Sequence, residues 1–230
     1  MAKKKDSAEE RIEAVEHALS KTEQFIESNQ KILTYVIGGI ILVILLFFIF
    51  KKYISSPREK AAEAAMFRAE YYFEQDSLDL ALNGDGENNG FLAVIDDYGS
   101  TKAGNLAKYY AGLCYLNKGE YQKAVDYLKK FSGEDLIVSG MALGALGDAY
   151  MQLNQTSKAL DYYLKAAEQH PNDFVSPTFM MKAGWSYEIL GEWKKAKEIY
   201  EKLKKEYPQS REAREVDRYI ARAKINLNEL

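Results

Sequence analysis

Residues 143–171 read LGALGDAYMQLNQTSKALDYYLKAAEQHP, and this stretch decides the fold. Its apolar residues recur every three or four positions, which predicts two amphipathic helices. Leu153-Asn154 lies between them, and asparagine tolerates the left-handed conformation in which many helices end. Gly147 on the first helix and Ala159 on the second are small enough to let the two backbones approach closely. We therefore expect a tightly packed helical hairpin.

The same spacing recurs on both sides of this stretch. Gly184 lies 37 residues after Gly147, and Gly112 lies 35 residues before it. Each expected second helix has an alanine at the equivalent place, followed four residues later by tyrosine or leucine. These residues are Ala124 with Leu128, Ala159 with Tyr163, and Ala196 with Tyr200. Such helix pairs can bury their apolar faces only against their neighbours, so we expect them to stack into a solenoid.

The spacing resembles that of the tetratricopeptide repeat (TPR), a helix pair of about 34 residues with the pattern W-x2-L-G-x2-Y, then A-x3-F, then proline. Leu146-Gly147, Tyr150 and Pro171 follow this pattern. The predicted TPR units are 105–138, 140–173 and 177–210. A degenerate copy is predicted at 62–101, with an insertion at 83–90, and a capping helix at 211–227.

A second stretch, 32–50, reads ILTYVIGGIILVILLFFIF, which is nineteen residues without a charge. As a helix it reaches about 28 Å, the depth of a bilayer's hydrocarbon core. It therefore predicts a transmembrane helix that begins at Ile32 and ends at Phe50. Lys51-Lys52 occupies the place where small residues would lead to a signal-peptidase site, so we expect an uncleaved anchor. We predict a charged, partly helical tail at 1–31 and a linker or helix extension at 51–61.

The predicted fold class is therefore all-α, with one N-terminal transmembrane helix, a TPR α-solenoid of about 3.5–4 helix pairs and a C-terminal capping helix. The formal net charge of -3 shows no basic excess, which argues against nucleic-acid binding. The single Cys114 excludes an internal disulfide, and its apolar helical surroundings predict a small core residue.

No catalytic constellation is found in the sequence. The two histidines, His17 and His170, lie on opposite sides of the predicted span, and no phosphate-binding loop or metal-spaced cysteine set occurs. We expect no enzyme activity, no cofactor, no metal and no small-molecule substrate. The insertion 83–90 fails the calcium-loop spacing because the twelfth position counted from Asp79 is Gly90. A metal-dependent role for Asp85 and Glu87 is kept as a remote alternative.

In TPR proteins the first helix of each pair lines the binding surface, so the resemblance implies candidate residues for a protein- or peptide-binding groove. They are Tyr109, Leu113, Leu116, Met141, Asp148, Met151, Met181, Lys182, Trp185 and Glu188. Most are apolar, and the methionines can adapt to varied partners. Only Lys182 is of the type that clamps a C-terminal carboxylate in some TPR domains, which argues against carboxylate recognition. The alternative is that several of these residues are buried between helices.

Two likenesses suggest a setting for the repeats. The segments ALNGDGENNGFLAVIDDYGSTKAGNLAKYYAGLCYL (81–116) and ALGALGDAYMQL (142–153) resemble membrane-anchored TPR proteins of Bacteroidota. The order of tail, anchor and repeats resembles the YfgM-like ancillary subunits of the SecYEG translocon. That resemblance implies a non-enzymatic scaffold of the bacterial inner membrane, with the N-terminus cytoplasmic and the repeats periplasmic. Its implied partners are Sec translocon subunits, emerging polypeptides and a membrane-anchored periplasmic chaperone.

The charges around the span predict the opposite orientation. Two basic residues lie within twenty residues before it and five within twenty after it. Positive charge favours the cytoplasmic side, so this count favours a cytoplasmic repeat domain, whereas long domains translocate largely regardless of charge. The second hypothesis is therefore a cytoplasm-facing adaptor that recruits soluble proteins to the membrane through its TPR groove.

Overall fold

The computed structural model describes residues 3–133 and 135–229, with side chains from residue 25 onward. Within these ranges the chain is all-helical, and the one bridge between extended residues joins Gly84 to Asn89. The predicted all-α class is confirmed. Two compact units are formed, Met1–Pro57 and Arg58–Leu230.

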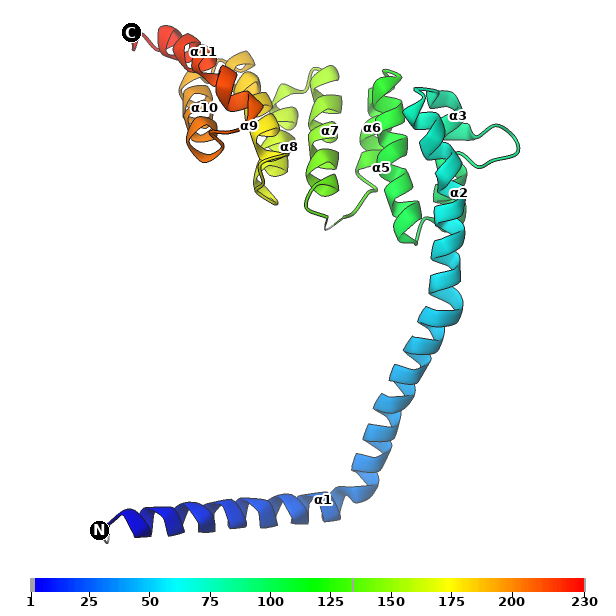
Figure 1. Ribbon diagram of the computed structural model, residues 1–230, viewed down its shortest axis with the longest axis vertical. Helices are drawn as coiled ribbons and strands as arrows, with labels where there is room; N and C mark the ends of the chain where they lie inside the picture. Colours follow the sequence, from blue (N-terminus) through cyan, green and yellow to red (C-terminus); the bar gives the residue numbers. More distant parts are fainter. Residues whose placement is uncertain (1–2, 134, 230) are drawn as a thin grey trace. The chain divides into compact units, whose positions relative to one another are not determined.

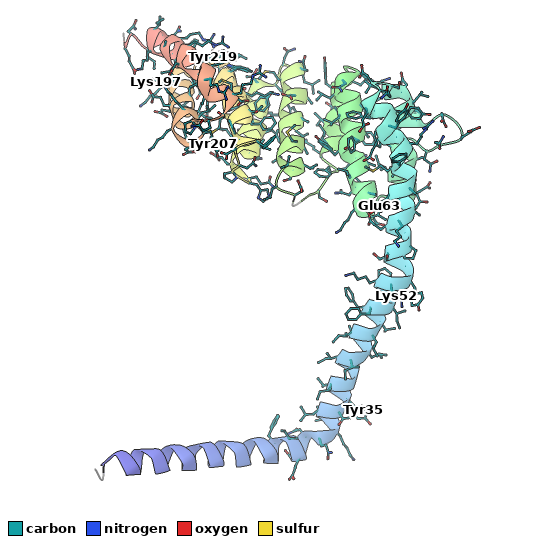
Figure 2. The ribbon with its side chains drawn as sticks, viewed as in Figure 1. Tyr35, Lys52, Glu63, Lys197, Tyr207 and Tyr219 are labelled. Carbon is teal, nitrogen blue, oxygen red and sulfur yellow. The ribbon has the colours of Figure 1, made fainter. Side chains whose placement is uncertain are left out.

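The first unit is dominated by one helix, α1 (Lys3–Phe50), followed by a short π-helix, η1 (Lys51–Ser55). The tail, expected to be partly helical, is helical from Lys3. Side chains of the apolar stretch project outward along the helix, from Tyr35 to beyond Lys52 (Figure 2), and all are exposed except Leu33. Among the described residues this is the one helix long and apolar enough to cross a membrane.

The second unit is a stack of helices, shown in Figure 1 from cyan to red. Its elements are α2 (Ser56–Glu74), α3 (Leu78–Asn83), α4 (Phe91–Tyr98), α5 (Lys102–Asn117), α6 (Tyr121–Leu128), α7 (Val138–Gln152), α8 (Thr156–Glu168), α9 (Ser176–Ile189), α10 (Trp193–Glu206) and α11 (Arg211–Asn226). Consecutive helices pack together from α5 to α11, and first helices also contact across pairs, α5 with α7 and α9 with α11. This nearest-neighbour packing is what a solenoid requires.

Three turns within the helix pairs have the same geometry. Gly119, Asn154 and Gly191 all have positive φ, between 59° and 78°. In the last turn, Gly191 N donates to Glu188 O at 3.0 Å and Glu192 N donates to Tyr187 O at 2.8 Å. The two earlier turns repeat this pair of bonds, which satisfies the last carbonyls of the helix. The left-handed conformation predicted at Asn154 is confirmed, and Gly119 and Gly191 adopt it in the other two turns.

The repeat glycines allow the close contact expected of them. A Cβ on Gly147 would lie 2.4 Å from the Tyr163 ring, and one on Gly184 would lie 2.1 Å from the Tyr200 ring. In the preceding pair, a Cβ on Gly112 would lie 2.5 Å from Cγ of Leu128. In each pair, a large side chain of the second helix therefore packs directly against the backbone of the first helix at the glycine.

The segment before α5 departs from a regular pair. Two short helices, α3 and α4, follow α2, and residues 84–90 form the loop between them. The Asp85 carboxylate accepts hydrogen bonds from the Tyr72 hydroxyl at 2.5 Å and from the backbone N of Asn88 at 2.7 Å. These bonds lower the pKa of Asp85, with the Tyr72 bond the largest cause. Asp85, which the sequence offers as a remote candidate for metal binding, thus accepts hydrogen bonds from protein donors instead.

Candidate functional site

All ten predicted groove residues lie on helices α5, α7 and α9, and we use the name first-helix face for the exposed surface of these three helices. Two of the ten are exposed large apolar residues: Met141 on α7 is 42% exposed and Trp185 on α9 is 40% exposed. Leu113, Leu116 and Met151 are partly buried against the core. These residues form a discontinuous apolar surface on successive first helices.

Tyr109 and Met181 do not belong to this surface. Tyr109 is 9% exposed and packs against Phe131, with ring centroids 5.7 Å apart. Met181 is 4% exposed and belongs to the hydrophobic core. The prediction that they face a groove is wrong, because each lies where neighbouring helices meet. A contact partner cannot reach either side chain without displacing core residues.

The predicted polar residue Asp148 is bonded within the protein. Its carboxylate accepts the Tyr163 hydroxyl at 2.8 Å and the Lys182 ammonium at 2.7 Å. Tyr163 comes from the second helix of the same pair, whereas Lys182 comes from the first helix of the next pair. Burial and the nearby carboxylate raise the pKa of Tyr163. The charge of Lys182 is therefore already paired with that of Asp148, which leaves Lys182 poorly suited to bind a free carboxylate.

Glu188 repeats this arrangement one pair later. It accepts the Tyr200 hydroxyl at 3.0 Å, and Arg222 on α11 donates to its two oxygens at 3.3 and 2.5 Å. Burial is again the largest cause of the raised pKa of Tyr200. We call each such set of tyrosine, carboxylate and cation a carboxylate bridge. The first bridge joins one repeat to the next, and the second joins the last repeat to the capping helix α11.

Two further residues of this surface, which the sequence did not predict, lie close to the predicted Trp185. Ile189 lies one helical turn after Trp185 and is exposed. Tyr219 on α11 lies beside Trp185, with ring centroids 5.9 Å apart, and so extends the aromatic surface. The i, i+4 spacing from Trp185 is a signal that could have identified Ile189. Nothing in the repeat pattern assigns Tyr219, because the capping helix does not follow the consensus.

A second part of the first-helix side lies between α2 and α5. There a groove of about 260 Å³ has Met66 and Leu106 among its lining residues, together with the carboxylates of Glu63 and Glu70. Burial, and then the charge of Glu74, raise the pKa of Glu70. Lys102 also lines this groove, so its charged residues are of both signs.

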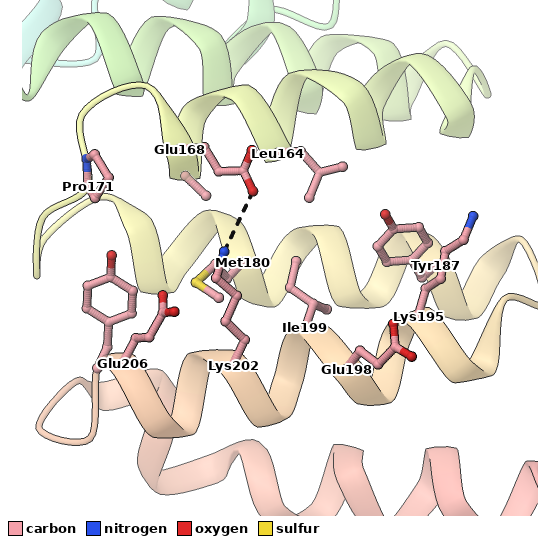
Figure 3. A pocket seen from close by; sticks show the side chains of 12 residues that line it. Leu164, Glu168, Pro171, Met180, Tyr187, Lys195, Glu198, Ile199, Lys202 and Glu206 are labelled. Carbon is pink, nitrogen blue, oxygen red and sulfur yellow. Dashed lines mark ion pairs between the residues drawn. The ribbon is translucent and has the colours of Figure 1, made fainter.

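A hollow of greater volume lies among α8, α9 and α10 (Figure 3). It has a volume of about 450 Å³, and Leu164, Met180 and Ile199 are among its apolar lining residues. Glu168 and Lys202 form an ion pair of 3.7 Å across it, drawn as a dashed line in Figure 3. The charges around this hollow are mixed in sign, so they select no particular ligand. The repeat pattern did not predict it.

Cys114 is a core residue, as expected. Its side chain is fully buried, and burial raises the pKa of its thiol to about 12. Such a thiol is protonated at neutral pH and poorly reactive. Among the described residues no group of three or more His, Cys, Asp or Glu side chains could hold a metal ion.

Comparison with known families agrees with this geometry. Family models described as tetratricopeptide repeat match residues 106–134 and 179–210, and a second such model matches 140–173. Neither describes a catalytic family. Three segments of this all-helical chain thus match the tetratricopeptide repeat, a repeat found in protein-interaction scaffolds. Comparison with curated proteins found no match.

Solved structures show the same fold. The crystal structure of MamA protein has a TM-score of 0.59 and 21% identity, and the match covers 73% of this chain and 83% of that one. YrrB, described as a TPR protein with an unusual peptide-binding site, has a TM-score of 0.55 and 19% identity. That match covers 78% of this chain and 84% of YrrB. At these identities the likeness concerns the fold alone.

Proposed function

We propose that the protein is a membrane-anchored, non-enzymatic scaffold whose first-helix face binds segments of protein partners. The observation that carries this proposal is the exposure of Met141 and Trp185 on that face, on successive repeats. Solenoid repeats present extended surfaces, on which exposed apolar side chains of successive repeats can contact one bound segment. The likeness to YrrB supports the idea that this fold can hold a peptide.

The apolar helix supports the anchor. A helix of nineteen uncharged residues with almost every side chain exposed is unfavourable in water, but it suits a hydrocarbon phase. Its backbone hydrogen bonds are satisfied within the helix, as a spanning segment requires. Carbonate extraction of membranes tests the anchor, and release of the intact chain into the supernatant would contradict it.

Photo-crosslinking tests the binding surface. A photoreactive phenylalanine derivative replaces Met141 or Trp185 in the full-length chain, and Ser157, exposed at the start of α8, is the matched control. We expect protein adducts from the first two positions and not from the control. Equal adduct yields at all three positions would show that the first-helix face has no special role.

The proposed setting is the bacterial inner membrane, with the N-terminus cytoplasmic and the repeats periplasmic beside the Sec translocon and a membrane-anchored chaperone. The resemblance to YfgM-like translocon subunits and to Bacteroidota membrane-anchored TPR proteins supports this setting. Purification in mild detergent tests it. Recovery of a stoichiometric complex without translocon subunits would refute the Sec assignment while leaving the scaffold role standing.

The second candidate is a cytoplasm-facing adaptor that recruits soluble proteins. The observation that favours it is the excess of basic residues after the span, five against two before it. Protease added to intact spheroplasts separates the two orientations. Digestion of the repeats places them outside the cytoplasm, whereas protection supports the adaptor.

A further inference from the structure

Exposed apolar side chains gather on the loops that precede α7 and α9. Leu136 and Ile137 lie just before α7, and Phe174 lies just before α9 with 83% of its surface exposed. Ile137 and Phe174 are 37 residues apart, so they occupy equivalent places in successive repeats. Loop tips seldom carry such residues in water, and nothing in the described chain covers them.

Hydrogen bonds place these loops on one edge of the solenoid. Asn172 donates to Leu136 O at 3.5 Å, which joins the two loops. Ser132, in the loop before α7, donates through its backbone N to Asn105 in the first turn of α5 at 3.2 Å. We call this side, where the first helices begin, the loop edge; Figure 1 shows it as the lower side of the helical stack.

The first turn of α2 belongs to the same edge. Glu59 accepts hydrogen bonds from the backbone N of Lys102 at 2.9 Å and of Ala103 at 2.8 Å, at the start of α5. The chain therefore enters the solenoid at the loop edge. Arg58 follows Phe50 by eight residues, which span at most about 28 Å when fully extended. With residues 32–50 in a bilayer, this chain connection limits how far the start of α2 can lie from the membrane surface.

We propose that Leu136, Ile137 and Phe174 insert into the headgroup region of the bilayer and hold the solenoid on the membrane by its loop edge. This inference rests on the proposed anchor. Apolar and aromatic side chains gain free energy by moving from water into that region. Asp135 and Asp173 flank the tips, while Lys102 lies on the same edge, so the contact depends on apolar burial and needs no anionic lipid.

Fluorescence of the full-length chain in phosphatidylcholine vesicles tests the contact. Phe174→Cys carries an environment-sensitive NBD label, and Ser157→Cys, at the opposite edge, is the matched control. Cys114 is buried, so the labelled wild-type chain serves as the blank. We expect the label at 174 to emit at shorter wavelength, to lose most of its quenching by aqueous iodide and to be quenched by brominated lipid tails. The label at 157 stays accessible to iodide.

Vesicle flotation separates failure of this inference from failure of the anchor. A chain that floats with the vesicles but leaves position 174 as accessible to iodide as position 157 refutes the lipid contact and leaves the anchor intact. A chain that does not float refutes the anchor and with it this inference. Protection at 174 that falls as the protein-to-lipid ratio is lowered identifies a second copy as the occupant and overturns the lipid assignment.

Discussion

The repeat formed by α5 and α6 and the two repeats that follow it fill the same space with different side chains. In the first, Leu128 packs against Gly112; in the others, Tyr163 and Tyr200 pack against Gly147 and Gly184. A leucine needs nothing further, but a buried phenol has a hydroxyl that must find a partner. Where tyrosine replaces leucine, neighbouring helices must therefore supply a hydrogen-bond acceptor for the buried hydroxyl.

The carboxylate bridges supply this acceptor and add an ion pair to it. A carboxylate from the first helix accepts the phenol, and a cation 34 residues further along pairs with the carboxylate. The cation belongs to the next repeat for Asp148 and to the capping helix for Glu188, so each buried hydroxyl is satisfied by a network that joins neighbouring parts of the stack. The comparison teaches that stacking in this solenoid is sustained by apolar packing at one end and by a polar network at the other.

The largest effect is expected from Gly184→Val. The new side chain would collide with the Tyr200 ring, which its bond to Glu188 holds in place, so we expect a loss of about 3 kcal/mol in the free energy of unfolding. Gly112→Val collides with the Leu128 side chain, which no hydrogen bond holds in place, and should cost less, about 2 kcal/mol. Thermal unfolding of the detergent-solubilised chain, followed by circular dichroism, measures both. Equal losses would remove the distinction between the two kinds of repeat.

Asp148→Ala should rank next. It leaves the Tyr163 hydroxyl buried without its acceptor and Lys182 without its counter-ion, at a cost of about 2 kcal/mol. Lys182→Met keeps the Asp148–Tyr163 bond and should cost less, because partly exposed ion pairs contribute little. Urea unfolding of the single and double variants gives the coupling. A Lys182 variant as damaging as the Asp148 variant would show that the ion pair, not the phenol, dominates.

Tyr163→Phe removes one hydrogen bond and no ring packing. We expect a loss of about 1 kcal/mol in the free energy of unfolding. Tyr162→Phe, on the same helix and stacked on Tyr150 at 5.3 Å, is the control and should change stability very little. The same urea titration compares the two variants. If both behave like the wild type, the bridge contributes nothing measurable to stability.

The smallest effect is a dependence on alkaline pH. The pKa values of Tyr163 and Tyr200 are raised in the folded state, whereas unfolded tyrosine ionises near pH 10. Their contribution is complete below about pH 10 and is lost as pH rises further, because only the unfolded chain then releases protons. Tyr163→Phe/Tyr200→Phe should flatten the decline in stability above pH 10. An unchanged slope would mean that these two tyrosines ionise normally in the folded protein.

Much of the fold could be predicted because it depends on local spacing. The Gly, Ala and Tyr positions identified the helix pairs, and the left-handed Gly and Asn turns followed from residue type. The candidate surface was less predictable. Tyr109 and Met181 share the register of exposed residues, yet neighbouring helices bury them, and that depends on how repeats rotate against one another. The partnership of Asp148 with Lys182 joins residues 34 apart, which helical periodicity does not specify.

The sequence by itself determined the helical class, the repeat positions and the apolar stretch from Ile32 to Phe50, because periodicity and uninterrupted hydrophobicity are properties of short segments. Only the tertiary structure decided which side chains of the first helices stay exposed, that Asp85 is bonded to Tyr72 on α2, and that Leu136, Ile137 and Phe174 share the edge at which α2 begins. Those facts depend on contacts between residues far apart in the chain. Such contacts are set by packing of whole helices, which no local pattern encodes.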